Sequence, residues 1–208
     1  MSVRYKIRDQ HGLNYMTCPI TGWVDLFTRQ VYRDIVLDSW RYCYQNKGFQ
    51  VHAYTIMPNH LHLIASCKPP FRLEEVMRDW KRHCARQTLL YLQDKSTVES
   101  RRDWLLYLFS YFALGKKNKQ TYQIWQHDNH PIELYSEEVI AQKMNYIHMN
   151  AVRAGFVEKP EDWKYSSAPF YAENEEEGIV KKEVLLDIVP VWQWYYEEGP
   201  GVWAKPGG

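Results

Sequence analysis

Residues 49–67 read FQVHAYTIMPNHLHLIASC, and this stretch predicts a β-hairpin. Its two halves, Phe49–Met57 and His60–Cys67, are rich in the β-branched and aromatic residues that favour strands. Pro58-Asn59 between them is a turn signal. Alternate side chains of a strand lie on the same face, about 7 Å apart. The second strand of this hairpin therefore sets two histidines side by side on one face of a sheet.

Further elements are expected on both sides of the hairpin. A strand at Leu13–Ile20 precedes it, followed by an amphipathic helix at Asp25–Asn46 that Lys47-Gly48 would end. The order strand, helix, strand, strand, helix predicts an α+β fold, with a ferredoxin-like antiparallel sheet and helices packed on one face of it. Later segments are expected to form helices at Leu73–Gln93, Ser100–Ala113 and Glu137–Ala154, a strand at Gln120–Gln126, a loop at His127–Pro131 and a helical piece near Val180–Ile188.

Length and composition exclude several classes of protein. The chain has 208 residues, of which 45% are hydrophobic and 25% charged, the balance of one large globular domain with an appendage. The most apolar stretch, Trp104–Leu114, is far shorter than the ~20 residues that span a bilayer. The N-terminal residues lack an apolar secretory block, so we expect a cytoplasmic protein without a membrane segment. Four widely spaced cysteines are expected to be buried, reduced thiols.

Charge is distributed unevenly along the chain. Residues 1–130 carry 19 Lys and Arg against 11 Asp and Glu, whereas residues 131–208 carry 7 against 14. A basic body with an acidic tail can attract a polyanion to one face, although solvated surface charge alone would give the same count.

The two histidines of the hairpin, His60 and His62, are candidates for metal binding. Both imidazoles can reach one divalent ion, but a pair of half-buried sheet histidines would have the same pattern. A third ligand and a reactive group would come from the helix that follows Ser136, where Tyr146 and Asn150 are four residues apart on one face. A tyrosine next to a metal can attack a phosphodiester, although spacing alone favours a packed or hydrogen-bonded aromatic residue.

Two motifs together resemble a known family. Tyr54–Ile64, followed about 80 residues later by Asn145–Val157, is similar to the paired signatures of the single-tyrosine HUH transposases, and most similar to the REP-associated tyrosine transposases. Supporting segments are Tyr15–Thr17, Trp125-Gln126, His130–Leu134 and Trp163–Ser167. The resemblance runs from about Asn14 to Tyr171. We therefore expect residues 1–171 to form an HUH transposase domain and residues 172–208 an acidic loop with an aromatic extension.

The resemblance implies a metal-dependent DNA strand transfer. His60 and His62 would bind Mg²⁺ or Mn²⁺, and Tyr146 would attack single-stranded DNA to give a 5′-phosphotyrosine intermediate and a free 3′-hydroxyl. Asn150 falls where the family has a polar third ligand. The usual proline after that asparagine is Ala151 here, which alters how the helix ends but removes no reactive group. His148 is two residues from the tyrosine and is interpreted as structural.

Basic residues support a nucleic-acid substrate. Arg78, Lys81, Arg82 and Arg86 form a stripe on the helix expected at Leu73–Gln93, and a second cluster follows Gly115. That cluster consists of Lys116, Lys117 and Lys119. An ordinary solvated helix face would look similar. The resemblance implies single-stranded or hairpin DNA near palindromic repeats as the partner.

Two rival functions stay open, as does the oligomeric state. A DNA-binding regulator that has lost cleavage would keep the fold and basic face, and a phosphoesterase that uses water would keep the metal site without a reactive tyrosine. Both a monomer and a homodimer are compatible with the resemblance. The aromatic residues of the tail could pack on the domain, stack on bases or cover a second subunit, and they are Trp192, Trp194, Tyr195, Tyr196 and Trp203.

Overall fold

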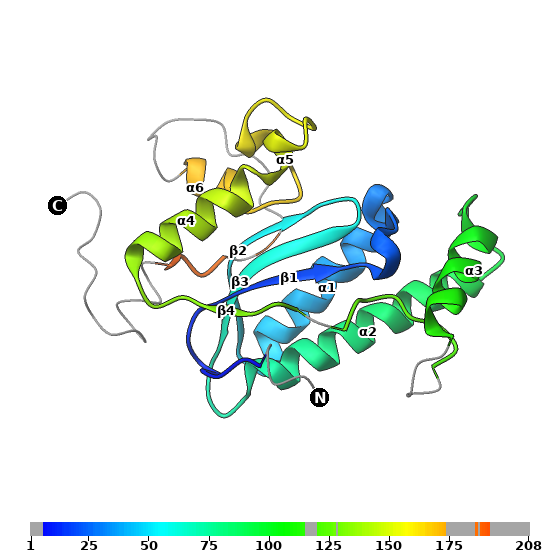
Figure 1. Cartoon of the computed structure of the whole chain (residues 1–208), viewed down its shortest axis with the longest axis horizontal. Coiled ribbons are helices and arrows are strands. Elements are labelled where there is room, and N and C mark those ends of the chain that lie inside the picture. Colours follow the sequence, from blue (N-terminus) through cyan, green and yellow to red (C-terminus); the bar gives the residue numbers. More distant parts are fainter. Residues whose placement is uncertain (1–5, 115–119, 128, 174–185, 187, 192–208) are drawn as a thin grey trace.

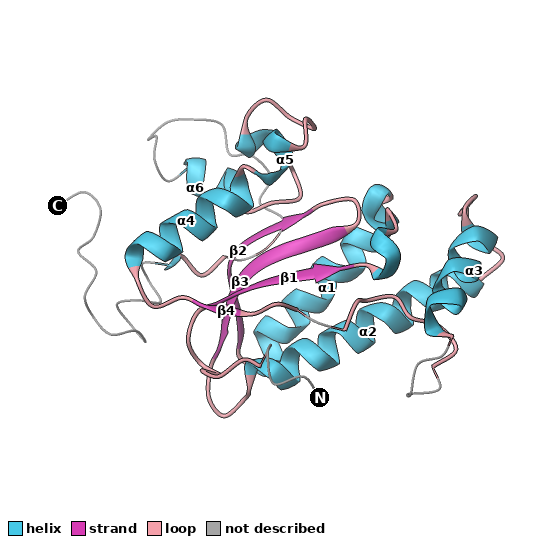
Figure 2. Cartoon of the chain, viewed as in Figure 1, coloured by secondary structure: helices cyan, strands magenta, loops and turns pink. Residues whose placement is uncertain are grey.

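The computed structural model describes residues 6–114, 120–127, 129–173, 186 and 188–191 (Figure 1). Its centre is a four-stranded antiparallel sheet with the strand order β2-β3-β1-β4 (Figure 2). The strands are β1 (Asn14–Pro19), β2 (Phe49–Ile56), β3 (His60–Cys67) and β4 (Ile132–Glu133). This order, with a helix in each crossover, is the split βαβ arrangement of ferredoxin-like folds. The α+β prediction is therefore confirmed.

Helices lie on both faces of the sheet (Figure 1). Helices α1 (Gln30–Lys47) and α2 (Leu73–Gln93) cover one face, and α4 (Glu137–His148) crosses the other. The sequence predicts helices on one face of the sheet, and the structure has helices on the second face as well. Strand β3 explains why, because Leu61 and Leu63 face α1 and α2 while Ile64 packs in the cluster that contains α4. A strand that is apolar on both faces needs cover on both.

The helix predictions are confirmed in outline and differ at several ends. Helix α2 has the predicted bounds, and Gly48 ends α1 with a φ of +59°. Helix α1 begins at Gln30, five residues later than expected, because two short 3-10 turns precede it, η2 (Thr21–Trp23) and η3 (Leu26–Thr28). The remaining helices are α3 (Arg102–Ala113), α5 (Asn150–Arg153), η4 (Pro160–Asp162) and α6 (Ala168–Glu173).

Other parts of the chain cover the free edge of β2 and the part of β1 that β4 does not pair with. On the β2 side, Ile56 N–H donates to the Tyr165 carbonyl, and Val189 N–H donates to that of Val51. On the β1 side, Gln126 N–H donates to the Pro19 carbonyl, and Thr17 N–H donates to that of Asn129. These hydrogen bonds satisfy edge groups that would otherwise face solvent.

The predicted strand at Gln120–Gln126 was wrong. This segment is an irregular loop with one β-bridge, between Ile20 and Trp125, and the fourth strand lies further on at Ile132–Glu133. A continuous ladder along β1 is interrupted at His130, whose φ is +44°, and at Pro131, which has no N–H to donate.

Several predictions fall outside the described residues. They concern Lys116, Lys117 and Lys119, most of the helical piece at 180–188 and the aromatic residues from Trp192 onward. The proposed domain boundary at 171 therefore stays a prediction. All four cysteines are buried and free, as expected. In the described part of the chain, no helix is both long and apolar enough to cross a membrane.

Replacement of buried Glu99 by alanine is expected to destabilise the fold by about 2–3 kcal/mol. Its fully buried carboxylate lies 3.1 Å from Arg29 and 3.2 Å from Arg101, and accepts a hydrogen bond from Tyr32. Burial alone would raise the pKa of Glu99, but the hydrogen bonds from Arg101 and Tyr32 leave it lowered.

The lowered pKa gives the effect of Glu99 a definite pH dependence. Its stabilisation is fully present above the ordinary glutamate pKa and is lost as the pH falls through the lowered value in the folded chain. Urea unfolding at neutral and acidic pH measures this, with exposed Glu158→Ala as the control. Equal stability of Glu99→Ala and the unmodified chain at neutral pH would contradict the prediction.

Candidate active site

Strand β3 places His60 and His62 on the face of the sheet that α4 covers. Their ring centroids are 4.7 Å apart, and the planes meet at 77°. His62 is only 4% exposed and His60 is half-buried. Two imidazoles at this separation can share one divalent ion.

His60 is held in the protonation state that a metal ligand needs. Its Nδ1 lies 2.7 Å from the side-chain oxygen of Asn59. An amide oxygen only accepts hydrogen bonds, so Nδ1 carries the proton and Nε2 keeps its lone pair. Burial lowers the pKa of His60, which favours the neutral ring.

His62 has one ring nitrogen in a hydrogen-bond network and one without a partner. Nδ1 lies 2.8 Å from the Tyr15 hydroxyl and 2.9 Å from the Thr17 hydroxyl. Nε2 is buried and has no hydrogen-bond partner among the described residues. Burial, followed by the nearby His60 and Lys143, lowers the pKa of His62 to about 3, so the ring is neutral. A buried, unpaired nitrogen on a neutral imidazole fits a metal ion.

Tyr146 lies next to this pair. Its ring centroid is 5.2 Å from that of His62, edge to face, and 6.2 Å from that of Tyr15. The residue is 38% exposed, so one side of it is open to a ligand. The predicted apolar stripe of its helix is also present, because Ile140 and Ile147 are fully buried against the sheet. The packing of this stripe turns the adjoining face of α4 toward the histidines.

Two cations surround Tyr146. Lys143 Nζ lies 5.9 Å from the Tyr146 ring centroid and 4.7 Å from that of Tyr15, and the Arg153 guanidinium lies 5.6 Å from the Tyr146 ring. Lys143 lies three residues before the tyrosine on the same face of α4, and Arg153 belongs to α5, the short helix that follows. Positive charge here favours a phosphate between the tyrosine and the histidines.

Asn150 begins α5, after a break at Met149 that divides the helix predicted over Glu137–Ala154. Among the described residues, no hydrogen bond joins the half-buried side chain of Asn150 to His60 or His62. Its role as a metal ligand therefore stays a prediction. Within the described residues, no three His, Cys, Asp or Glu side chains form a metal-binding group.

His148 has a structural position, as its offset from Tyr146 predicts. Its Nε2 lies 2.9 Å from the Ser167 hydroxyl, and its ring packs 5.3 Å from that of Tyr171. Ser167 in turn receives a hydrogen bond from the backbone N–H of Tyr54 in β2. These contacts attach the end of α4 to the sheet and fix the height of Tyr146 above it.

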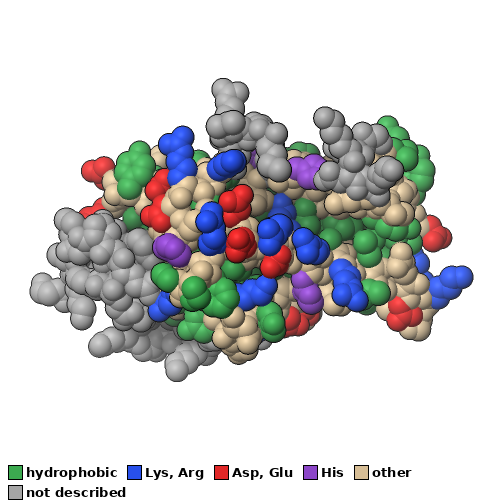
Figure 3. Space-filling model, turned by 90° about the horizontal axis from the view of Figure 1, so that it is seen from below, with side chains coloured by type: hydrophobic (Ala, Val, Ile, Leu, Met, Phe, Trp, Pro, Cys, Tyr) green, Lys and Arg blue, Asp and Glu red, His purple; other side chains and the backbone are tan. Residues whose placement is uncertain are grey.

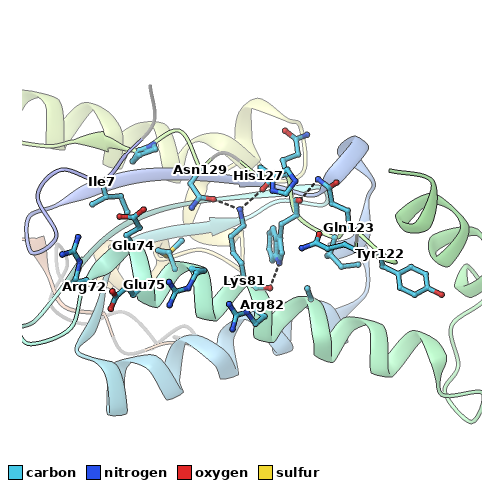
Figure 4. Close-up of a pocket in the computed structure, with 18 residues that line it drawn as sticks. Ile7, Arg72, Glu74, Glu75, Lys81, Arg82, Tyr122, Gln123, His127 and Asn129 are labelled. Atoms are coloured by element: carbon cyan, nitrogen blue, oxygen red, sulfur yellow. Dashed lines mark hydrogen bonds between the residues drawn. The ribbon is translucent and has the colours of Figure 1, made fainter. Parts of the chain in front are cut away.

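The predicted basic stripe on α2 borders a groove away from the histidine pair. This groove has a volume of about 700 Å³ and lies between α2 and residues 120–131 (Figure 4). Arg78, Lys81 and Arg82 line it, together with Arg72, while Arg86 is exposed further along the helix. Seen from below, Lys and Arg side chains gather across the middle of the molecule, interspersed with acidic ones (Figure 3).

The basic residues of the groove differ in what they contact. Lys81 Nζ donates to the Gln126 carbonyl at 2.9 Å and to the Asn129 side chain, and so holds the opposite wall of the groove (Figure 4). Arg78 pairs with Asp79 at 3.3 Å. Arg82 is exposed at the rim. A DNA-binding role for any of them stays a prediction.

Sequence reasoning missed four residues of the site. Tyr15 and Thr17 support His62 from β1, where Thr17 is its register partner. Lys143 and Arg153 provide the positive charge around the tyrosine. Tyr15 and Thr17 could have been found because they alternate in the strand expected beside the hairpin, so their side chains share one face. Lys143 and Arg153 could have been found from their spacing to Tyr146 in the predicted helix.

Comparison with known proteins identifies the family of the chain. Residues 24–128, just over half of the chain, match the family described as Transposase IS200 like. The chain belongs to the IS200-like transposase family. The matched residues include both histidines and end before α4.

Solved structures also resemble the chain, and two of them are transposases. One is a REP-associated tyrosine transposase bound to a REP hairpin, 17% identical, with a TM-score of 0.57, covering 91% of this chain and 99% of that one. At this identity the likeness shows the fold. The other is a transposase candidate from Deinococcus radiodurans R1, 18% identical, covering 68% of this chain and 93% of that one, whose TM-score of 0.37 carries no argument. No curated protein matches the sequence.

Proposed function

We propose that the protein is a metal-dependent transposase that cleaves and rejoins single-stranded DNA through a 5′-phosphotyrosine on Tyr146. One observation carries this proposal: the half-exposed Tyr146 ring packs against His62, whose buried Nε2 has no described partner. A tyrosine with a purely structural role does not need an unpaired imidazole nitrogen, a potential metal ligand, beside it. A metal site that used water as the nucleophile would not need a tyrosine beside the metal ligands.

In the proposed reaction the chain supplies the nucleophile and the positioning groups. A Mg²⁺ or Mn²⁺ ion held by His60, His62 and the Asn150 amide would polarise the scissile phosphate as a Lewis acid. The Tyr146 oxygen attacks phosphorus and loses its proton to solvent. The bond from phosphorus to the 3′ oxygen breaks, and that oxygen takes up a proton to become a 3′-hydroxyl.

The downstream strand remains on Tyr146 through its 5′ phosphate. Lys143 and Arg153 lie close enough to the ring to neutralise charge on that phosphate. Attack by a 3′-hydroxyl reverses the step, rejoins the strand and releases the tyrosine. One phosphodiester replaces another at each stage, so no external energy source is needed.

The proposed substrate is a hairpin or palindromic repeat with a single-stranded flank. A REP hairpin is what the similar solved transposase binds. In this chain, Asn129 lines the groove beside α2, and its carbonyl accepts the N–H of Thr17. The Thr17 hydroxyl contacts His62. A DNA backbone that lies in the groove would therefore need to pass only Thr17 of β1 to reach His62 and Tyr146.

A covalent adduct separates this proposal from its rivals. The full chain is incubated with Mn²⁺ and a pool of hairpins with randomised arms, labelled at either the 3′ or the 5′ end. The proposal predicts a denaturation-resistant protein band with the 3′ label only, because the downstream fragment stays attached. A phosphoesterase would cut DNA without a labelled band, and a regulator would only bind it.

The groove gives a separate prediction for Arg82. Arg82→Ala should weaken binding to all hairpins alike and reduce the slope of log affinity against log salt by about 0.7–0.9, the loss of one phosphate contact. Fluorescence anisotropy over a range of salt concentrations measures both. Lys95→Ala, exposed just beyond the end of α2, is the matched control and should leave the slope unchanged. An unchanged slope for Arg82→Ala would remove this arginine from the interface.

A further inference from the structure

Trp23 is an exposed tryptophan beside the histidine pair that the proposed mechanism does not use. It is 53% exposed, and its ring centroid lies 5.5 Å from that of His60 with the planes at 72°. An indole ring left more than half open to solvent contributes little to the core. Its position next to a candidate metal ligand calls for another explanation.

The backbone holds Trp23 in a conformation that bulky residues rarely adopt. Its φ is +54°, and that of the preceding Gly22 is +62°. Such left-handed residues persist only where the surrounding structure fixes them, and they concentrate at functional sites. Trp23 N–H donates to the Ile20 carbonyl at 3.0 Å, which closes the turn.

Helix α3 fixes this turn from behind. The Phe112 ring of α3 occupies the space that a side chain at position 22 would need, since a Cβ on Gly22 would lie 2.3 Å from it. Glycine is therefore required there for space as well as for its positive φ. The close contact with α3 makes the Gly22-Trp23 turn a fixed support that directs the indole outward.

Trp23, His60, His62 and Tyr146 form a row of rings. Successive ring centroids are 5.5, 4.7 and 5.2 Å apart. A phosphate that reaches Tyr146 beside the histidines would place a neighbouring nucleotide at the other end of the row. There the exposed surface of Trp23 offers the kind of aromatic platform on which any base can stack.

We propose that Trp23 is a stacking platform for a nucleobase of the DNA strand that flanks the scissile phosphate. This inference rests on the proposed function and adds a contact to the same site. Stacking of this kind is tolerant of sequence, so Trp23 would position the strand without selecting a particular base.

A double-mutant cycle between protein and DNA tests the platform. Binding is measured in the Tyr146→Phe chain, which prevents cleavage, with a fluorescent hairpin that carries thymidine arms. Trp23→Ala should weaken binding roughly tenfold or more. A single abasic site is then moved along the arm. At one position it should weaken binding by about as much as Trp23→Ala does. In the Trp23→Ala chain, an abasic site at that position should cause no further loss. Trp23→Phe should retain most of the affinity.

Two controls keep the result interpretable. Trp104→Ala removes a tryptophan of similar exposure, 51%, from α3 and should change neither affinity nor the abasic profile. Trp23→Leu keeps a large apolar side chain without a flat ring, so it should show the same loss of affinity and of the abasic effect, and it replaces Trp23→Ala in the cycle if alanine impairs folding.

The possible outcomes are distinct. Equal abasic profiles with and without Trp23 would overturn the platform while leaving the proposed function intact. A position-specific loss without any covalent adduct in the cleavage assay would support the platform and overturn the cleavage proposal. Failure of the Tyr146→Phe chain to bind the hairpin would overturn both.

Discussion

Tyr146→Phe is expected to abolish the covalent protein–DNA band and to lower strand cleavage by roughly 10⁴-fold or more, the scale of losing a nucleophile. The substitution removes one oxygen and keeps the ring, so the contacts with His62, Tyr15 and Arg153 survive. DNA affinity should therefore stay nearly unchanged. Quantifying the denatured adduct and the released 3′ end in the same samples measures both effects.

Two further phenylalanine variants act as controls for Tyr146→Phe. Tyr135→Phe changes a tyrosine that is 80% exposed just before α4 and should cleave normally. Tyr15→Phe removes the hydroxyl beside His62 Nδ1 and should slow cleavage while the adduct still forms. An adduct of undiminished amount on the Tyr146→Phe chain would assign the nucleophile to another residue.

His62→Ala should abolish specific Mn²⁺ binding and reduce cleavage by roughly 10³-fold, the loss of several kcal/mol of Lewis-acid stabilisation. The reason is the buried Nε2, which is oriented by Tyr15 and Thr17 at the opposite ring nitrogen. Calorimetric titration with Mn²⁺ gives a result that does not depend on activity. Binding to the folded state should also raise the Tm of the unmodified chain and not that of His62→Ala.

A matched buried histidine controls for packing effects. His52 is fully buried, and both its ring nitrogens have partners, Ser66 and the Val189 carbonyl. His52→Gln should therefore keep the Mn²⁺ response, whatever it does to stability. Full Mn²⁺ binding by His62→Ala would remove His62 from the metal site.

Much of the fold could be predicted because its decisive features are local. The hairpin carries its own strand and turn signals, and β3 and α2 have the bounds that the sequence predicts. The proximity of Tyr146 to His62 could be expected only through the resemblance. Periodicity does not indicate which face of a sheet a distant helix will cover. Helix α4, which carries Tyr146, lies on the face opposite α1 and α2.

Two differences between the sequence-based expectation and the structure have a common cause in long-range contacts. Residues 120–126 have strand-like composition, but Trp125 packs against Trp80 and Phe27, and the short β4 completes the sheet instead. Lys81 fitted a solvated stripe by spacing, yet it is half-buried and reaches across to Gln126. In both cases a partner more than 40 residues away determines the local structure, and helical or strand periodicity contains no information about it.

The covered margins of the sheet limit how two copies of this protein can meet. Joining sheets through β2, or through the part of β1 beyond β4, would first require removal of residues 165–167 and 189, or of Gln126 and Asn129, with the loss of their backbone hydrogen bonds. In the described part of the chain, this cover keeps the edges of β1 and β2 from acting as templates for fibrous aggregation. Self-association that keeps the cover in place would use side-chain surfaces, and its strength would respond to single surface substitutions.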